Sequence, residues 1–149
     1  MFNIALYQPD IPQNTAAIIR LCSCFDTTLE IIEPCGFFIN DKRLKRVAMD
    51  YLKETKIKTY KSYKDFLNKK KNSRVILMTT KAQKKYNNFK FKKKDTILFG
   101  RESSGVPKIV HKNSNQRLRI PIKKNVRSLN IGMAVAITLS EALRQNSKL

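Results

Sequence analysis

Two stretches in the second half of the chain combine glycine with polar side chains that could hold a ligand. They are residues 98–107 and 120–132, and each leaves an apolar, strand-like run for a loop of small and polar residues. The chain has only four glycines, and three of them, Gly100, Gly105 and Gly132, lie here. Glycine is needed where φ is positive or where two backbones approach closely. The sequence therefore predicts a ligand cradle beside two strand ends.

The common phosphate and dinucleotide motifs are excluded. A P-loop carries Lys and then Ser or Thr directly after its second glycine, but Gly105 is followed by Val106 and Pro107. A dinucleotide fingerprint needs three close glycines after the first strand, and residues 8–14 contain none. The cradle is therefore of another kind.

The elements that must position these loops alternate between strand and helix patterns, which favours a parallel α/β sheet flanked by helices in one domain, residues 1–149. The lengths and apolar periods predict strands at 2–7, 29–32, 57–60, 75–78, 96–99 and 118–121. Helices are expected after Pro12, at 41–51, at 63–69, after Pro107 and at 129–145, with a loop at 81–94.

The last predicted helix is apolar on nearly every side, which indicates burial by both the sheet and a second subunit.

Charge is concentrated in the middle of the chain. The formal net charge is +20, and residues 42–94 carry 20 Lys or Arg against three acidic residues. A lysine-rich solvated surface would explain this, and so would a polyanionic partner whose phosphates the cations neutralise. A membrane surface is disfavoured because no sustained amphipathic helix accompanies the basic runs. Nucleic acid is the preferred partner.

Other features exclude further classes. No apolar run approaches a membrane span of about 18 residues, and the N-terminus lacks a signal-peptide pattern, so a cytoplasmic location is expected. Cys22, Cys24 and Cys35 form no CxxC pair, and His111 is the single histidine, so we expect reduced thiols and no metal site. We assign His111 no chemistry.

Three motifs in order carry a family resemblance. The first is Asn14-Thr15 with 18–22, the second is 98–107 with its Gly100, Glu102, Gly105 and Pro107, and the third is Ile120-Pro121 with 127–130. With these motifs the chain resembles the SPOUT superfamily of S-adenosylmethionine-dependent RNA methyltransferases. Within it, the chain is similar to the small tRNA ribose 2′-O-methyltransferases of the TrmL (YibK) type. The resemblance covers nearly the whole chain.

The resemblance implies methyl transfer from S-adenosylmethionine to a ribose 2′-hydroxyl of tRNA, at the wobble position of leucine tRNAs. It also implies a deep C-terminal trefoil knot and a homodimer through the first and last helices. The implied catalytic residues are Arg20, Asn14 and Asn130. The implied cofactor-binding residues are Met78, Gly100, Glu102, Gly105, Ile120, Ser128 and Leu129.

Each implied residue also has a plainer interpretation. Arg20 could be a surface salt-bridge residue, Glu102 a loop acid, and Asn130 or Ser128 a helix N-cap. Because a guanidinium is a poor base, the role expected for Arg20 is to orient the ribose and stabilise the developing alkoxide, with a phosphate or a water as the proton acceptor.

The chain departs from the family pattern at three positions. Ala16 and Gly132 stand where relatives commonly carry glycine and serine, and Ser140 stands where close relatives carry tyrosine. These departures motivate an alternative, a catalytically silent RNA-binding module of the same fold. A methyltransferase acting on ribosomal RNA is a third possibility.

Overall fold

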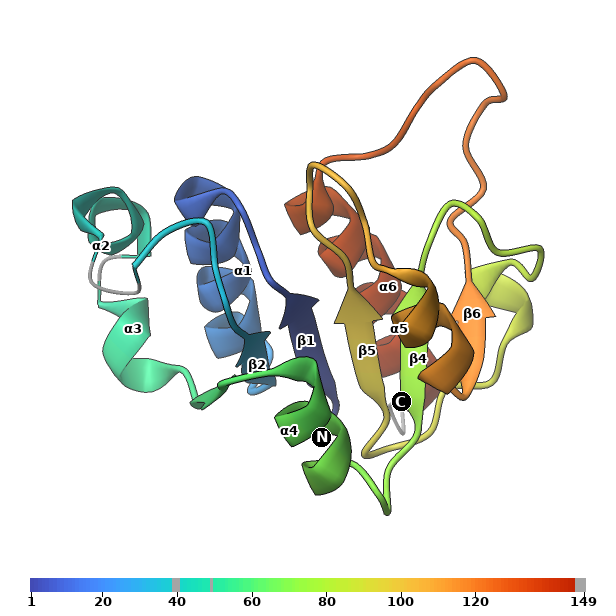
Figure 1. Ribbon diagram of the computed structural model, residues 1–149, viewed down its shortest axis with the longest axis horizontal. Coiled ribbons are helices and arrows are strands. Elements are labelled where there is room, and N and C mark those ends of the chain that lie inside the picture. Colours follow the sequence, from blue (N-terminus) through green and yellow to red (C-terminus); the bar gives the residue numbers. More distant parts are fainter. Residues whose placement is uncertain (39–40, 49, 147–149) are drawn as a thin grey trace.

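The computed structural model describes residues 1–38, 41–48 and 50–146. Their strands form one six-stranded parallel sheet, which confirms the α/β class expected from the sequence (Figure 1). The strands are β1 (Asn3–Tyr7), β2 (Thr28–Ile32), β3 (Ile57–Tyr60), β4 (Val75–Met78), β5 (Thr96–Phe99) and β6 (Gln116–Leu118). Their order in the sheet is β3-β2-β1-β5-β4-β6.

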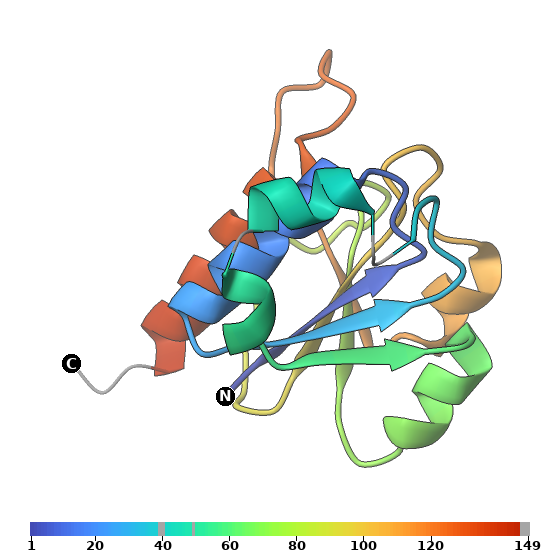
Figure 2. The same cartoon turned by 90° about the vertical axis from the view of Figure 1, so that its left-hand side faces the viewer.

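Helices cover both faces of this sheet. One face carries α1 (Pro12–Cys24), α2 (Lys42–Ala48), α3 (Tyr51–Glu54) and α6 (Ile131–Asn146). The other face carries α4 (Tyr63–Lys69) and α5 (Lys108–Asn113). The two layers are separated clearly when the molecule is viewed along the sheet (Figure 2).

The central strands are apolar along their whole length because both of their faces are buried. In β4, Ile76 and Met78 belong to the core beneath α1 and α6, whereas Val75 and Leu77 belong to the core beneath α4 and α5. Continuous apolar runs are typical of parallel strands that are covered on both sides.

Several boundaries differ from the sequence prediction. The helix expected over 41–51 is two helices, α2 and α3, and position 49 between them lies outside the described residues. The Asp41 side chain caps α2 by accepting a hydrogen bond of 2.7 Å from the Arg43 amide. The last strand, β6, begins and ends earlier than expected and contributes only Leu118 to the core.

The segment 81–94, expected to be a loop, is partly structured. It contains a short 3-10 helix at Tyr86–Asn88, and Phe89 and Phe91 are buried. The Gln145 side chain of α6 hydrogen-bonds to the backbone of both phenylalanines, accepting from the Phe91 amide at 2.9 Å and donating to the Phe89 carbonyl at 3.0 Å. These contacts fix the segment against the end of α6.

The order of the strands reverses between β1 and β5. On one side of this point the sheet continues from β1 to β2 and then β3. On the other side it continues from β5 to β4 and then β6. Ligands of open α/β sheets bind in the crevice outside the carboxyl ends of the strands at such a reversal. The loops after β1, β4, β5 and β6 meet at this edge.

Candidate functional site

A cleft of about 540 Å³ lies at the reversal point of the sheet, at the carboxyl ends of the strands. It is lined by the start of α1, by the loop after β4, by the loop after β5 and by the segment that leads into α6. A narrower apolar recess of about 100 Å³ adjoins it and shares several lining residues with it, including Met78, Phe99 and Leu129. The volume of the cleft lies within the usual range of small-molecule sites.

Nine of the ten residues that the sequence singled out line this cleft or its recess. Ile120 lines the recess, Met78, Ser128 and Leu129 line both, and the other five line the cleft: Asn14, Gly100, Glu102, Gly105 and Asn130. The fold therefore brings these nine residues together around one continuous cleft and recess.

A chain of hydrogen bonds joins three of these residues. The Asn130 side-chain amide donates to Asn14 Oδ1 at 3.0 Å, and the Asn14 amide donates to Glu102 Oε1 at 3.3 Å. The other oxygen of Glu102 accepts from the Asp10 backbone amide at 2.9 Å. Glu102 therefore connects the loop after β5 to the loop after β1 and to the start of α1.

Asn130 is also the N-cap of α6. Its side-chain oxygen accepts from the Gly132 amide at 2.8 Å, while its amide group contacts Asn14. The two interpretations open at Asn130, helix cap and site residue, are compatible because each uses a different end of the side chain.

The loop after β5 requires glycine at two positions. A Cβ on Gly100 would lie 2.7 Å from the Gly105 carbonyl carbon, and Gly105 itself has φ +67. Arg101 and Gly105 exchange two backbone hydrogen bonds of 2.9 Å, which close the loop on itself. The close approach and the left-handed turn explain why both glycines are at this strand end.

Arg20 is the one predicted site residue that lines neither the cleft nor its recess. It is exposed on α1, and its guanidinium lies 5.1 Å from the centre of the Tyr51 ring. Six residues along a helix correspond to about 9 Å, so Arg20 lies about 1.7 turns beyond Asn14 on α1. Within one chain, Arg20 is apart from the residues of the cleft.

A clasp that sequence reasoning missed holds the cleft loops together. Asp10 Oδ1 accepts from Arg101 Nη2 at 2.6 Å and from Nε at 3.0 Å, and Asp10 Oδ2 accepts from the Ser103 hydroxyl at 2.6 Å. Asp10 lies between two prolines directly after β1 and is one of only 11 acidic residues in a strongly basic chain. A rare acidic residue in a proline-flanked segment after a strand was the signal available in the sequence.

Some groups elsewhere in the fold lack features of a reactive site. Burial raises the pKa of the Cys22 thiol to about 12 and that of the Cys35 thiol to about 11. In the described ranges, no three His, Cys, Asp or Glu side chains are grouped as metal ligands. Within residues 1–38, 41–48 and 50–146, no helix is both long and apolar enough to cross a membrane.

The family profile described as "SpoU rRNA Methylase family" matches residues 1–140. The chain belongs to this family. The match covers β1 through most of α6 and so includes every loop of the cleft.

Individual relatives agree with the assignment to the SpoU family. A tRNA (cytidine(34)-2′-O)-methyltransferase of Beijerinckia indica is 43% identical over 95% of this chain and 90% of its own length. A solved structure described as "Structural insights into the 2-OH methylation of C/U34 on tRNA" is 34% identical, covers 97% of this chain and 95% of its own, and has a TM-score of 0.94. SpoU methyltransferase AviRb of Streptomyces viridochromogenes, solved with AdoMet, shares the fold at 18% identity with a TM-score of 0.88 over 96% of this chain and 57% of its own.

Acid is expected to weaken the Asp10 clasp of this SpoU-family protein. The hydrogen bonds from Arg101, and then those from Ser103, lower the pKa of the Asp10 carboxyl. A lowered folded-state pKa gives stability that is full above the unfolded value of about 3.9 and is lost as the pH falls through the folded value. Thermal unfolding between pH 7 and pH 2.5 should therefore show a larger loss of Tm in the wild type than in Asp10→Asn.

The Asp10→Asn variant is the reference for the wild type at low pH, because the protonated Asp10 carboxyl and the amide that replaces it are both uncharged. The two proteins should differ most at pH 7 and converge at the acid end. Parallel curves with a constant separation would contradict the titration of Asp10 as the cause.

Proposed function

We propose that this protein transfers a methyl group from S-adenosylmethionine to the ribose 2′-hydroxyl of the nucleotide at position 34, the wobble position, of leucine tRNAs. The observation that carries the reaction and its position on the tRNA is the near full-length similarity to a tRNA (cytidine(34)-2′-O)-methyltransferase at 43% identity. The geometry of the cleft supports it, because an apolar recess and a polar rim lie side by side at the reversal point of the sheet.

The cleft fits S-adenosylmethionine in size and in the character of its lining. The recess offers apolar surface suited to the adenine ring, from Met78, Phe99, Ile120 and Leu129. The adjoining cleft offers hydrogen-bonding groups suited to a ribose and an amino acid, among them Glu102 and Ser128. When bound, S-adenosylmethionine supplies a sulfonium methyl group that is already activated for transfer.

The chain's own residues have mainly to position the reactants. Gly100 and Gly105 keep the β5 loop closed, and Glu102 connects it to α1 through Asn14. Asn14 and Asn130 lie together in the lining of the cleft, where they can orient the target ribose. Correct alignment of two reactants can contribute roughly 7–11 kcal/mol at best, so a site with few acid–base groups can be effective.

We also propose a homodimer through α1 and α6. These two helices pack side by side on one face of the sheet (Figure 1). In a single chain, Met133 and Ile137 of α6 leave 62% and 37% of their surface exposed, one helical turn apart. A two-fold contact would cover them, and it would allow α1 of one protomer, with Arg20, to approach the cleft of its partner.

We further propose that residues 1–149 form one domain whose C-terminal segment is threaded as a deep trefoil knot. One sheet with a core on each face supports a single domain, and the last three residues lie outside the described part. The contacts of Gln145 with Phe89 and Phe91 hold the end of α6 against the segment between β4 and β5. A crystal structure in which the backbone forms no knot would contradict this proposal.

Purified protein, labelled S-adenosylmethionine and unmodified leucine tRNA test the reaction directly. We expect label in the tRNA, mapped to the 2′-oxygen of nucleotide 34 by resistance of the adjacent linkage to alkaline hydrolysis. Ribosomal RNA fragments are tested in a parallel reaction, and label in these fragments alone would favour the rRNA substrate that the family description names. Binding of tRNA without any methyl transfer would favour the silent module.

Cofactor binding should appear as a thermal shift. S-adenosylhomocysteine at 100 times its Kd is expected to add about 2.7 kcal/mol of stability. At about 2–4 °C per kcal/mol for a chain of this size, Tm should rise by about 5–11 °C. ATP, which lacks the thioether, serves as the control nucleotide. An equal shift with ATP, or none with S-adenosylhomocysteine, would contradict the assignment of the recess.

Met133→Glu is expected to separate the dimer. The Met133 side chain is exposed in the single chain, so the protomer should lose less than about 0.5 kcal/mol of stability. In the dimer, the two-fold axis would bury two unpaired glutamates at the contact, which disfavours association. Light scattering should show the monomer mass. Ile109→Glu, at an exposed apolar residue on the opposite face of the sheet, should leave the dimer intact. A monomeric wild type, or a dimeric Met133→Glu, would contradict this interface.

A further inference from the structure

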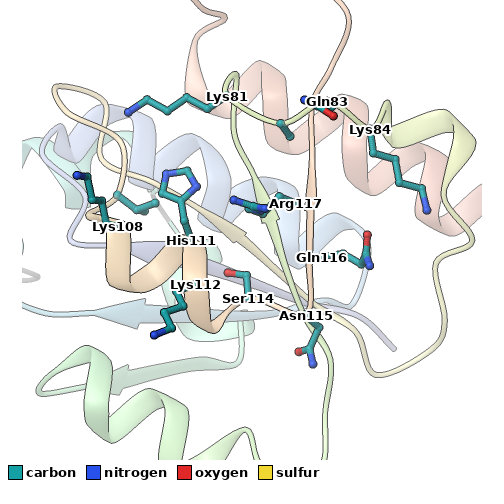
Figure 3. Close-up of a pocket in the computed structure, with 12 residues that line it drawn as sticks. Lys81, Gln83, Lys84, Lys108, His111, Lys112, Ser114, Asn115, Gln116 and Arg117 are labelled. Atoms are coloured by element: carbon teal, nitrogen blue, oxygen red, sulfur yellow. The ribbon is translucent and has the colours of Figure 1, made fainter.

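A basic groove of about 1020 Å³ lies beside the cleft, at the β6 edge of the sheet (Figure 3). Its walls are α5, the loop that follows β4, and β6. Lys81, Val106 and His111 line both the groove and the cleft, so the two are continuous. The groove is thus an extension of the candidate active site along the molecular surface.

The groove is strongly positive and has no acidic neighbour in its lining. Five cations line it: Lys81, Lys84, Lys108, Lys112 and Arg117. All five are exposed, and none takes part in the ion pairs formed between described residues. Elsewhere the fold pairs its partly buried cations, as in Arg74–Asp95 and Arg101–Asp10. The unneutralised charge of the groove is suited to an anionic partner.

The remaining lining residues indicate which part of a nucleic acid would fit. They are mostly small or polar, including Gln83, Ser114 and Gln116, and no Phe, Tyr or Trp is among them. Base recognition in single strands relies on aromatic stacking, whereas phosphates and sugars are held by Lys, Arg, Ser and Gln. The groove therefore suits a sugar–phosphate backbone rather than bases.

We propose that this groove holds the phosphate backbone of the RNA strand beside the target nucleotide, as a sequence-independent track that leads into the cleft. The proposal rests on the proposed function, because it requires an RNA ribose in the cleft. It assigns a role to α5 and β6, which contribute few residues to the cleft itself.

His111 offers a direct reporter of occupancy. It is the single histidine of the chain and lies at the junction of groove and cleft. Burial, followed by the charges of Lys81 and Arg117, lowers its pKa. Lys108 and Lys112 line the same groove from its own helix. A phosphate placed among these cations would offset their repulsion and raise the pKa of His111.

The test compares two triple variants with equal loss of charge. The groove variant is Lys108→Ala, Lys112→Ala and Arg117→Ala. The control is Lys64→Ala, Lys69→Ala and Lys71→Ala, three exposed residues in and just after α4. Affinity for an unmodified tRNA anticodon arm is measured from 50 to 300 mM KCl. Each lost phosphate contact lowers the slope of log K against log salt by about 0.7–1, so the groove variant should lose about 2–3 units.

The control variant should keep the wild-type slope within about one unit. Equal slopes in wild type and groove variant, or equal losses in both variants, would overturn the track. Anticodon arms with permuted bases next to the target should show the same difference between variants. A difference confined to one base sequence would overturn the sequence-independent role.

Two further measurements separate the track from the methylation proposal. Titration of the His111 ring by NMR should show a higher pKa with the anticodon arm bound, and an unmoved pKa would overturn the track. The groove variant should keep its affinity for S-adenosylhomocysteine, since none of its three substituted residues lines the cleft or the recess. If the wild type binds RNA with the predicted slopes and His111 shift but transfers no methyl group, the methylation proposal fails while the track stands. Equally tight binding of polyglutamate, with the same shift of His111, would overturn the assignment to nucleic acid.

Discussion

Arg20→Ala is expected to lower the rate of ribose methylation by about 10²–10³-fold at saturating tRNA and cofactor, while the affinity for S-adenosylmethionine changes by only a few-fold. The reason is spatial. The residues expected to bind the cofactor line the cleft or its recess, whereas Arg20 lies apart from both, over Tyr51. A charge-assisted contact made in the transition state is worth on the order of 2–4 kcal/mol by analogy with oxyanion donors. Single-turnover methylation and cofactor titration on the same sample measure both quantities.

The alternative role of Arg20, stability alone, predicts a different result. An exposed cation–π contact contributes about 0.5–1 kcal/mol, so Arg20→Ala would lower Tm by only about 1–4 °C and leave the folded enzyme active. Arg46→Ala, which removes an exposed arginine from α2, is the matched control for the loss of one charge. Full activity in well-folded Arg20→Ala would remove Arg20 from the mechanism.

Gly100→Ala is expected to damage the cleft at its base. The new Cβ would lie 2.8 Å from the Gly105 Cα and 2.7 Å from its carbonyl carbon, and both are backbone atoms that no side-chain rotation can move. Overpacking of this kind typically costs about 1–3 kcal/mol, or about 2–12 °C in Tm here. Because the β5 loop must shift, we expect cofactor affinity to fall on the order of 10-fold or more, measured by calorimetry.

Gly132→Ala provides the comparison for Gly100→Ala. There the new Cβ would meet only the Asn130 side-chain oxygen, at 3.2 Å, in the first turn of α6. The better helix propensity of alanine, about 1 kcal/mol, offsets a small displacement, so Tm should change little. If Gly100→Ala were as stable as Gly132→Ala and bound cofactor normally, the proposed closure of the β5 loop would be wrong.

Much of the fold could be predicted from local patterns, because the central strands are short apolar runs buried on both faces. Residues 75–78 and 96–99 were predicted as strands with the bounds observed. The order of strands could not be predicted, since placing β5 between β1 and β4 depends on long-range pairing that leaves no local signal. The last strand was predicted at 118–121 and lies at Gln116–Leu118. Only Leu118 of this strand is buried, so its sequence has no alternation of apolar and polar residues to detect.

For the site, the glycines located the loops, and the family resemblance supplied most of the individual residues. The clasp between Asp10 and Arg101 was missed because its partners are 91 residues apart and only the sheet brings them together. The last helix was predicted to be buried by both the sheet and a second subunit. In the single chain, Met133 and Ile137 of α6 remain exposed. Their burial by a second subunit stays a prediction, as do the roles of the site residues.

The hydrogen bond between Asn14 and Asn130 spans 116 residues of sequence and has a consequence for how the protein is made. A polypeptide emerging from the ribosome exposes Asn14 early, but the residue that completes the site is synthesised near the end. Parallel pairing of β1 with β5 likewise waits for Thr96–Phe99. Such non-local contacts slow folding, because the entropy of loop closure is lost before the contacts form. A cofactor that binds only the completed cleft therefore distinguishes finished chains from fragments truncated before α6.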